Sequence, residues 1–259
     1  MAMLYEICIE RPGDVVAAAA GGAGGVEMCG PLSEGGVTPS LGAIEACVSG
    51  RGDLHVNVLI RPRAGDFCFD DTEVAVMVRD IELARAAGAQ GVVLGALTAA
   101  GAVDRPATTR LLDAAGDLTV TFHRAFDMTA DPRATLDTLL ELGFDRVLTS
   151  GQAGSAADAI PLLRELQAQA GERLRIVPAG GIDETNVARV VAGTGVREVH
   201  STAMIPVPSP ATYRNTAAHM GREIDEYASQ VTAAEKVARL VALARSGSRD
   251  AEGLRRDRA

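Results

Sequence analysis

Short apolar runs rich in β-branched residues alternate with amphipathic segments along most of the chain. The runs predict eight strands, at residues 4–10, 25–29, 55–61, 91–97, 118–124, 146–150, 174–179 and 198–202. Helical periodicity follows each of them, at residues 12–20, 40–49, 71–87, 104–115, 131–142, 156–170, 185–193 and 232–245. This alternation indicates an α/β protein whose parallel sheet closes into a single-domain TIM (β/α)8 barrel, with a doubly wound open sheet as the alternative. We expect the barrel to span residues 1–245 and the arginine-rich residues 246–259 to be disordered.

The alternation within each strand predicts which side chains face the barrel axis. Apolar residues at alternate positions, such as Tyr5, Ile7 and Ile9, should pack against the helices. The opposite parity is polar in five strands and includes Glu6, Cys8, Glu10, Glu27, Cys29, Asn57, Arg61, Thr119, Thr121, His123 and His200. A structural barrel interior carries mostly Val, Ile and Leu, so these residues predict a site at the barrel mouth. A purely structural ion network is the alternative.

The charge balance restricts the class of partner. The 259 residues include 25 Lys and Arg and 34 Asp and Glu, which gives a net charge of −9. This excess of acid argues against nucleic acids and acidic membrane surfaces, and an aromatic content of 3% without tryptophan argues against base stacking. No run of about 18 apolar residues and no signal-peptide pattern occurs. We therefore expect a cytoplasmic protein whose four cysteines remain reduced.

Acid–base catalysis is one function that the inward cluster could serve. Its catalytic residues would be Glu6, Glu27, Arg61, His123 and His200. The substrate would be a small phosphorylated or carboxylated molecule, and the chemistry that of an epimerase, isomerase or lyase. A Schiff-base aldolase is excluded because the sole lysine, Lys236, lies in the last predicted helix.

Glycine loops after the sixth and seventh strands favour an anion site at the same mouth. The expected contacts are Ser150, Gly151, Gly180 and Gly181, with Arg214 closing over the anion. In the neighbouring loops, Arg63 and Asp66 are expected to pair with each other or to contact a ligand. Asp127, at the end of the stretch TFHRAFD, is expected to tether its loop or to pair with Arg124.

Several segments together give the chain a resemblance to a known family. VEMCGPLSEGGVTPSLG, LIRPRAGDFCF, GALT, TVTFHRAFDM, RVLTSGQ, PAGGI and EVHST occur in an order and spacing similar to those of the CutC family, described as copper homeostasis proteins. The resemblance extends from residue 4 to about residue 216, with Ala64 standing where the family usually shows glycine. It implies a TIM barrel, a cytoplasmic location, a homo-oligomer (dimer or tetramer) and copper(I) binding by the cysteines that match Cys8 and Cys29.

Copper binding has a physical basis in the strand pattern. Cys8 and Cys29 share inward parity on neighbouring strands, and Cu(I) prefers soft thiolate ligands. The alternative is that both cysteines are small buried hydrophobic residues. Met28 should face the helices, Cys47 should pack in a helix, and Cys68 is an outside candidate ligand. Glu6 and Glu27 with His123 and His200 offer a different ligand set, suited to zinc or manganese, and no nucleotide cofactor is expected.

Overall fold

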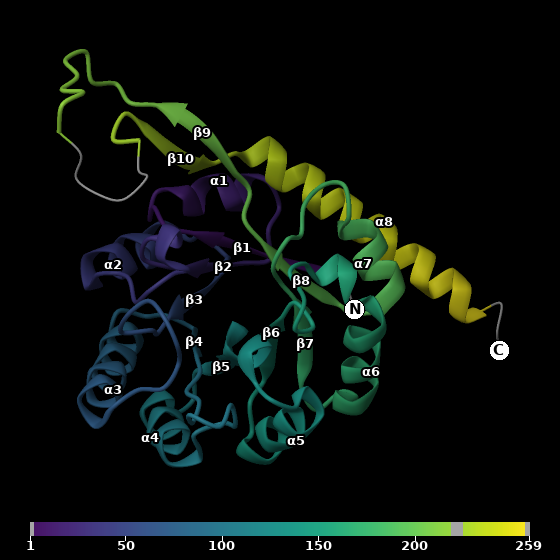
Figure 1. Ribbon diagram of the computed structural model, residues 1–259. Coiled ribbons are helices and arrows are strands. Elements are labelled where there is room, and N and C mark those ends of the chain that lie inside the picture. The colour runs from purple at the N-terminus through teal and green to yellow at the C-terminus, as the bar shows by residue number, and fades with distance from the viewer. Residues whose placement is uncertain (1–2, 219–224, 257–259) are drawn as a thin grey trace.

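Eight strands form one parallel sheet in the computed structural model, which describes residues 3–218 and 225–256. They are β1 (Leu4–Ile9), β2 (Gly25–Met28), β3 (His55–Leu59), β4 (Gly91–Leu94), β5 (Thr119–Phe122), β6 (Arg146–Thr149), β7 (Arg175–Pro178) and β8 (Glu198–Ser201). The hydrogen-bonded order is β7-β6-β5-β4-β3-β2-β1-β8, and β7 also packs beside β8, which nearly closes the barrel (Figure 1). The TIM-barrel prediction is confirmed, and the open sheet is excluded.

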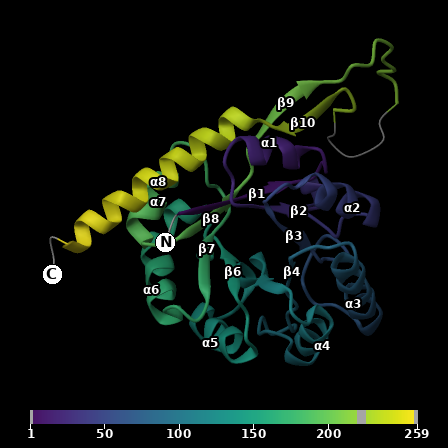
Figure 2. The same ribbon diagram turned by 180° about the vertical axis from the view of Figure 1, so that it is seen from behind.

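Helices surround this barrel on the outside, as the view from behind also shows (Figure 2). They are α1 (Asp14–Ala20), α2 (Leu41–Gly50), α3 (Asp71–Ala86), α4 (Arg105–Ala115), α5 (Pro132–Leu142), α6 (Ile160–Ala170), α7 (Val187–Thr194) and α8 (Ala234–Arg256). Short 3-10 helices lie at Leu32–Glu34 (η1), Arg124–Met128 (η2) and Ala156–Asp158 (η3). Local sequence fixes several helix starts: Asp70 and Glu73 form a capping box on α3, and Asp131 caps α5 just before Pro132.

The C-terminal part of the chain departs from the prediction in two ways. After β8 the chain forms an antiparallel hairpin, β9 (Met204–Pro208) with β10 (Ala228–Thr232), which the sequence pattern did not predict. Helix α8 then runs to Arg256, so residues 246–256 are helical and the prediction of a disordered tail was wrong for them. The remaining tail residues, 257–259, lie outside the described residues. Packing explains the longer helix, because α8 crosses α7 so closely that a Cβ on Gly247 would lie 2.3 Å from the carbonyl oxygen of Ala188.

The two faces of the sheet carry the side chains that their parity predicts. Tyr5, Ile7, Ile9 and Met28 belong to the large core between strands and helices. A separate and smaller apolar cluster lies inside the barrel and consists of Cys8, Cys29, Leu59, Val93, Leu148, Val177 and Ala179. Buried polar side chains occupy the rest of the interior, and they form the site described below. Among the described helices, none has both the length and the apolar character needed to span a membrane.

Candidate functional site

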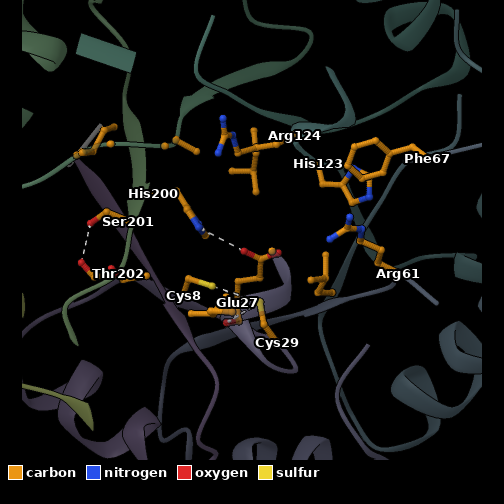
Figure 3. Close-up of a pocket in the computed structure, with 18 residues that line it drawn as sticks. Cys8, Glu27, Cys29, Arg61, Phe67, His123, Arg124, His200, Ser201 and Thr202 are labelled. Carbon is orange, nitrogen blue, oxygen red and sulfur yellow. Dashed lines mark hydrogen bonds and ion pairs between the residues drawn. The ribbon is translucent and has the colours of Figure 1, made fainter. Parts of the chain in front are cut away.

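A cavity of about 350 Å³ lies at the carboxyl ends of the barrel strands, where TIM barrels carry their sites (Figure 3). Its lining includes Cys8, Glu27, Cys29, Arg61, Phe67, His123, Arg124, Gly180, Gly181, His200, Ser201 and Thr202. Four of the five predicted acid–base residues are therefore brought together, from β2, β3, β5 and β8 or the residues directly after them. The fifth, Glu6, is absent from this lining.

Glu6 lies deeper in the barrel than the cavity and forms a hydrogen bond with the His200 ring. Its Oε2 is 2.8 Å from Nδ1 of His200 and 3.0 Å from Nη2 of Arg146, and its Oε1 accepts a 2.5 Å hydrogen bond from Asn57. Arg146 in turn contacts Glu198 at 2.6 Å. The predicted catalytic role of Glu6 thus becomes a positioning role, because side chains of this buried network separate it from the mouth.

The network sets the charges of its members. Burial alone would raise the pKa of Glu6, but Arg146 and His200 outweigh burial and lower that pKa, so Glu6 is a carboxylate. Burial alone would lower the pKa of His200, but Cys8, Glu6 and Glu27 raise it well above its ordinary value. The pKa of Glu27 is raised, first by burial and then by the Cys8 thiolate. His200 is therefore an imidazolium between the Glu6 carboxylate and Glu27, a carboxyl group whose pKa is raised.

Cys8 and Cys29 are in direct contact at the cavity wall, as their shared parity predicts. Their Sγ atoms are 3.2 Å apart, and both side chains are buried. The hydrogen bond from Cys29 lowers the pKa of Cys8 to about 6 despite burial, whereas the same contact, together with burial, raises the pKa of Cys29. The pair is thus a thiolate at Cys8 that accepts a hydrogen bond from the Cys29 thiol.

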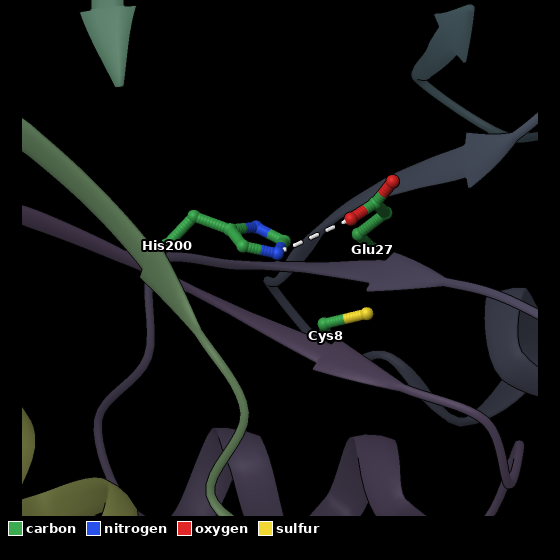
Figure 4. A group of neighbouring side chains, drawn as sticks. All are labelled: Cys8, Glu27 and His200. Atoms are coloured by element: carbon green, nitrogen blue, oxygen red, sulfur yellow. Dashed lines mark ion pairs between the residues drawn. The ribbon is translucent and has the colours of Figure 1, made fainter. Parts of the chain in front are cut away.

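One group of potential metal ligands is assembled in the described part of the chain. Cys8, Glu27 and His200 each place a ligand atom within 4.8 Å of the others, and Glu27 Oε2 is 3.3 Å from His200 Nε2 (Figure 4). His123 is outside this group, so the predicted set of two histidines and two glutamates does not form a single site. Met28 faces the outer core and Cys47 lies buried in α2, as predicted, while Cys68 is exposed.

His123 and Arg61 form the wall of the cavity that faces His200 (Figure 3). The His123 ring lies 4.9 Å from that of Phe67, and its Nδ1 accepts a hydrogen bond from the Ala125 N–H. Burial, followed by the charge of Arg61, lowers the pKa of His123 to about 3. His123 is therefore a neutral imidazole with its proton on Nε2, in contrast to His200.

Two loops were predicted to bind an anion. In the loop after β6, side chains of the protein already accept hydrogen bonds from the backbone N–H groups, whereas in the described structure the N–H groups of Gly180 and Gly181 after β7 have no acceptor. Asp127 accepts from the N–H groups of Ser150 and Gln152 at 3.0 and 3.2 Å, and Gly151 donates to Thr149. Ser150 and Gly151 are therefore engaged by the chain itself and not available to a ligand. Gly180 and Gly181, after β7, do line the cavity.

The structure confirms the contacts predicted for Asp127 and Arg63 and contradicts the one predicted for Arg214. Asp127 both tethers its loop and contacts Arg124 at 2.8 Å, as expected. Arg63 pairs with Asp66 at 3.1 Å. Arg214, in contrast, is exposed and stacks on Tyr227 between β9 and β10, so the prediction that it closes over the anion was wrong. Beside Arg61, the cavity lining contains a second arginine, Arg124, which was not among the predicted anion contacts.

Comparisons with known proteins agree with this fold. The family model described as "CutC family" matches residues 3–205. A CutC family protein of Bacteroides thetaiotaomicron is 44% identical over 235 residues, which cover 90% of this chain and 94% of that protein. The human copper homeostasis protein cutC homolog is 44% identical over 245 residues, covering 94% of this chain and 89% of its own. A CutC crystal structure from Streptococcus agalactiae has a TM-score of 0.74 at 33% identity and covers 77% of this chain and 98% of its own. The chain belongs to the CutC family.

Proposed function

We propose that this protein binds copper(I) at the barrel mouth through Cys8 and Cys29 and handles the ion in the cytoplasm. The observation that carries the proposal is the contact between the two sulfurs, which are 3.2 Å apart at the wall of a cavity. Cu(I) is a soft ion that favours thiolates, and one of these sulfurs is already a thiolate because the pKa of Cys8 is about 6. Several relatives carry copper homeostasis in their names, which agrees with this assignment.

The separation of the sulfurs defines what must change when the ion binds. At a metal–sulfur distance of about 2.3 Å, sulfurs 3.2 Å apart subtend an angle of only about 90° at the metal. A linear site would need about 4.6 Å and a trigonal one about 4 Å. We infer that the cysteine side chains rotate apart by roughly 1 Å or more, and that the proton of Cys29 is released as the metal replaces the hydrogen bond.

His200 is the natural third ligand. Its Nε2 faces Glu27 and the Cys8 side of the cavity, while its Nδ1 is held by Glu6. A carboxylate that accepts the proton of one ring nitrogen orients the other nitrogen toward a metal and increases its basicity. His200 would lose its Nε2 proton on binding, and Glu27, a hard oxygen ligand, would remain outside the Cu(I) coordination.

The test is an anaerobic competition for Cu(I) between the protein and a chromophoric Cu(I) chelator. We expect Cys8→Ser with Cys29→Ser to reduce the apparent affinity by at least about 100-fold, since both thiolate ligands are lost. His200→Gln should reduce it by a smaller factor. Cys47→Ser and Cys68→Ser are matched controls, because Cys47 is buried in α2 and Cys68 is exposed outside the cavity lining. Unchanged Cu(I) affinity in the double variant would rule out this site.

A further inference from the structure

The cavity is much more positive than the protein that contains it. The whole chain carries a net charge of −9, yet the cavity lining holds Arg61, Arg124 and the His200 imidazolium against one thiolate, Cys8. Within the described lining, Glu27 is the single Asp or Glu side chain, and its pKa is raised. A positively lined hollow in an acidic protein concentrates small anions and repels cations other than those that bind through specific ligands. The copper proposal makes no use of this charge.

Arg61 is the least compensated of these cations. Its side chain is buried, with the residue 7% exposed, and Nη1 and Nη2 donate to the carbonyl oxygens of Gly36 at 2.9 Å and Gly65 at 2.6 Å. No described carboxylate lies within ion-pair distance of it, and its Nε has no partner there. Phe67 covers the guanidinium at 4.9 Å. Carbonyl dipoles satisfy the donors but leave the charge without a counter-ion, which is costly in a buried position.

A second anion-binding element lies at the loop after β7. Gly180 and Gly181 have φ angles of +90° and +64°, and within the described chain their N–H groups donate to no acceptor. A Cβ on Gly180 would lie 2.9 Å from Cζ of Arg124, so glycine is needed for the guanidinium to lie against this backbone. At the equivalent positions after β6, the Gly151 N–H donates to the Thr149 hydroxyl and the Gln152 N–H to Asp127. The loop after β7 is therefore open for an external oxyanion, beside a cation.

We propose that the cavity binds a small organic phosphate. The phosphoryl oxygens accept from the Gly180 and Gly181 N–H groups and from Arg124, and a second anionic group of the same molecule, such as a carboxylate, pairs with Arg61. The volume of about 350 Å³ limits the ligand to a small molecule. This site is distinct in its residues from the cysteine pair, so it stands whether or not copper binds.

Calorimetric titration of the full chain with three probes tests the proposal: 2-phosphoglycolate, inorganic phosphate and glycolate. We expect 2-phosphoglycolate to bind about tenfold more tightly than inorganic phosphate, and glycolate to bind more weakly than both. Arg124→Gln should weaken both phosphate compounds by about 10- to 100-fold, the usual effect of losing a charge-assisted hydrogen bond. Arg61→Gln should remove the preference for 2-phosphoglycolate over inorganic phosphate.

Arg63→Gln is the matched control. Arg63 is two residues from Arg61 but pairs with Glu73 and Asp66 and does not line the cavity, so binding should be unchanged. Arg61 also donates hydrogen bonds to three loop carbonyl oxygens, so Arg61→Gln could disturb the loops as well as remove the charge. Arg61→Lys keeps the charge and serves as a second variant. It should retain the preference for 2-phosphoglycolate. The proposal is overturned if the wild-type protein binds neither phosphate compound at millimolar concentration, or if Arg124→Gln binds them as the wild type does.

Discussion

Nδ1 of His200 lies 2.8 Å from Oε2 of Glu6, and this contact connects the mouth of the barrel to a buried ion network beneath it. Glu6 also contacts Arg146, which contacts Glu198, so the imidazole is held by residues that do not line the cavity. The ring nitrogen that faces the cavity is therefore held in one orientation. The structural ion network that the sequence left as an alternative is present, and it lies beneath the candidate site.

Replacing Glu6 tests this network. Glu6→Gln removes the charge that faces both Arg146 and His200 but keeps the shape of the side chain. Breaking a buried ion pair typically costs 3–5 kcal/mol, and since Arg146 retains Glu198 we expect a loss of about 3 kcal/mol in the free energy of unfolding, measured in urea. Glu82→Gln, which breaks an exposed contact with Arg79, should lose less than about 1 kcal/mol. Equal losses in the two variants would contradict a stabilising role for the buried network.

The reactivity of Cys8 tests the thiol pair directly. Because the pKa of Cys8 is about 6, compared with about 8.5 for a free cysteine, its alkylation rate should reach half of its plateau near pH 6. The measurement is iodoacetamide labelling with peptide mass spectrometry in a Cys68→Ser background, which removes the exposed thiol. Cys29→Ser should raise the pH of this midpoint, since the hydrogen bond from the Cys29 thiol lowers the pKa of Cys8. A midpoint that remains near 8.5 in the parent protein would show that Cys8 is not a thiolate at neutral pH.

The barrel and much of its mouth could be predicted because strand parity is a local property. The alternation in β1, β2, β3, β5 and β8 was sufficient to place Cys8, Cys29, Glu27, His123 and His200 inside the barrel. The register was not predictable in this way, because β1 and β2 pair Cys8 with Glu27, so the contact between Cys8 and Cys29 is diagonal.

Contacts across the barrel could not be predicted in the same way. Arg146 on β6 meets Glu6 on β1, and such a pairing depends on the curvature of the closed sheet rather than on any local pattern. A signal did exist, because Glu198 has the same parity as His200 and should therefore point inward. Arg214 was misplaced because the chain leaves the barrel after β8 in a hairpin whose strands are mostly exposed and carry little apolar alternation.

His123 should make the protein less stable in acid. Its pKa is about 3 in the folded protein and about 6.5 when unfolded, so below pH 6.5 the unfolded chain takes up a proton that the folded chain does not. The stabilising effect of a neutral His123 is complete above pH 6.5 and decreases as the pH falls toward 3. His123→Asn keeps an acceptor for the Ala125 N–H and does not titrate. Between pH 6 and pH 4, the wild type should lose about 2.5 kcal/mol more than this variant in urea unfolding. Parallel pH profiles would contradict a neutral buried His123.

Asp127 occupies, with its own carboxylate, the N–H groups of the loop after β6 that would otherwise be open to an anion. Its carboxylate is 7% exposed and accepts from the Ser150 and Gln152 N–H groups and from the Thr149 hydroxyl at 2.6 Å. Asp127→Ala leaves these donors unmet, and we expect a loss of about 3 kcal/mol in the free energy of unfolding. Asp66→Ala, which removes an exposed carboxylate that also pairs with an arginine, should lose much less.

The decisive readout for Asp127 is rescue by a small carboxylate. Acetate can place its two oxygens where those of Asp127 lie in the wild type, so it should raise the melting temperature of Asp127→Ala more than that of the wild type. Chloride at the same ionic strength controls for general salt effects, because screening acts on both proteins alike. If acetate and chloride shift the variant equally, the loop after β6 does not form an anion site, and the contrast with Gly180 and Gly181 loses its basis.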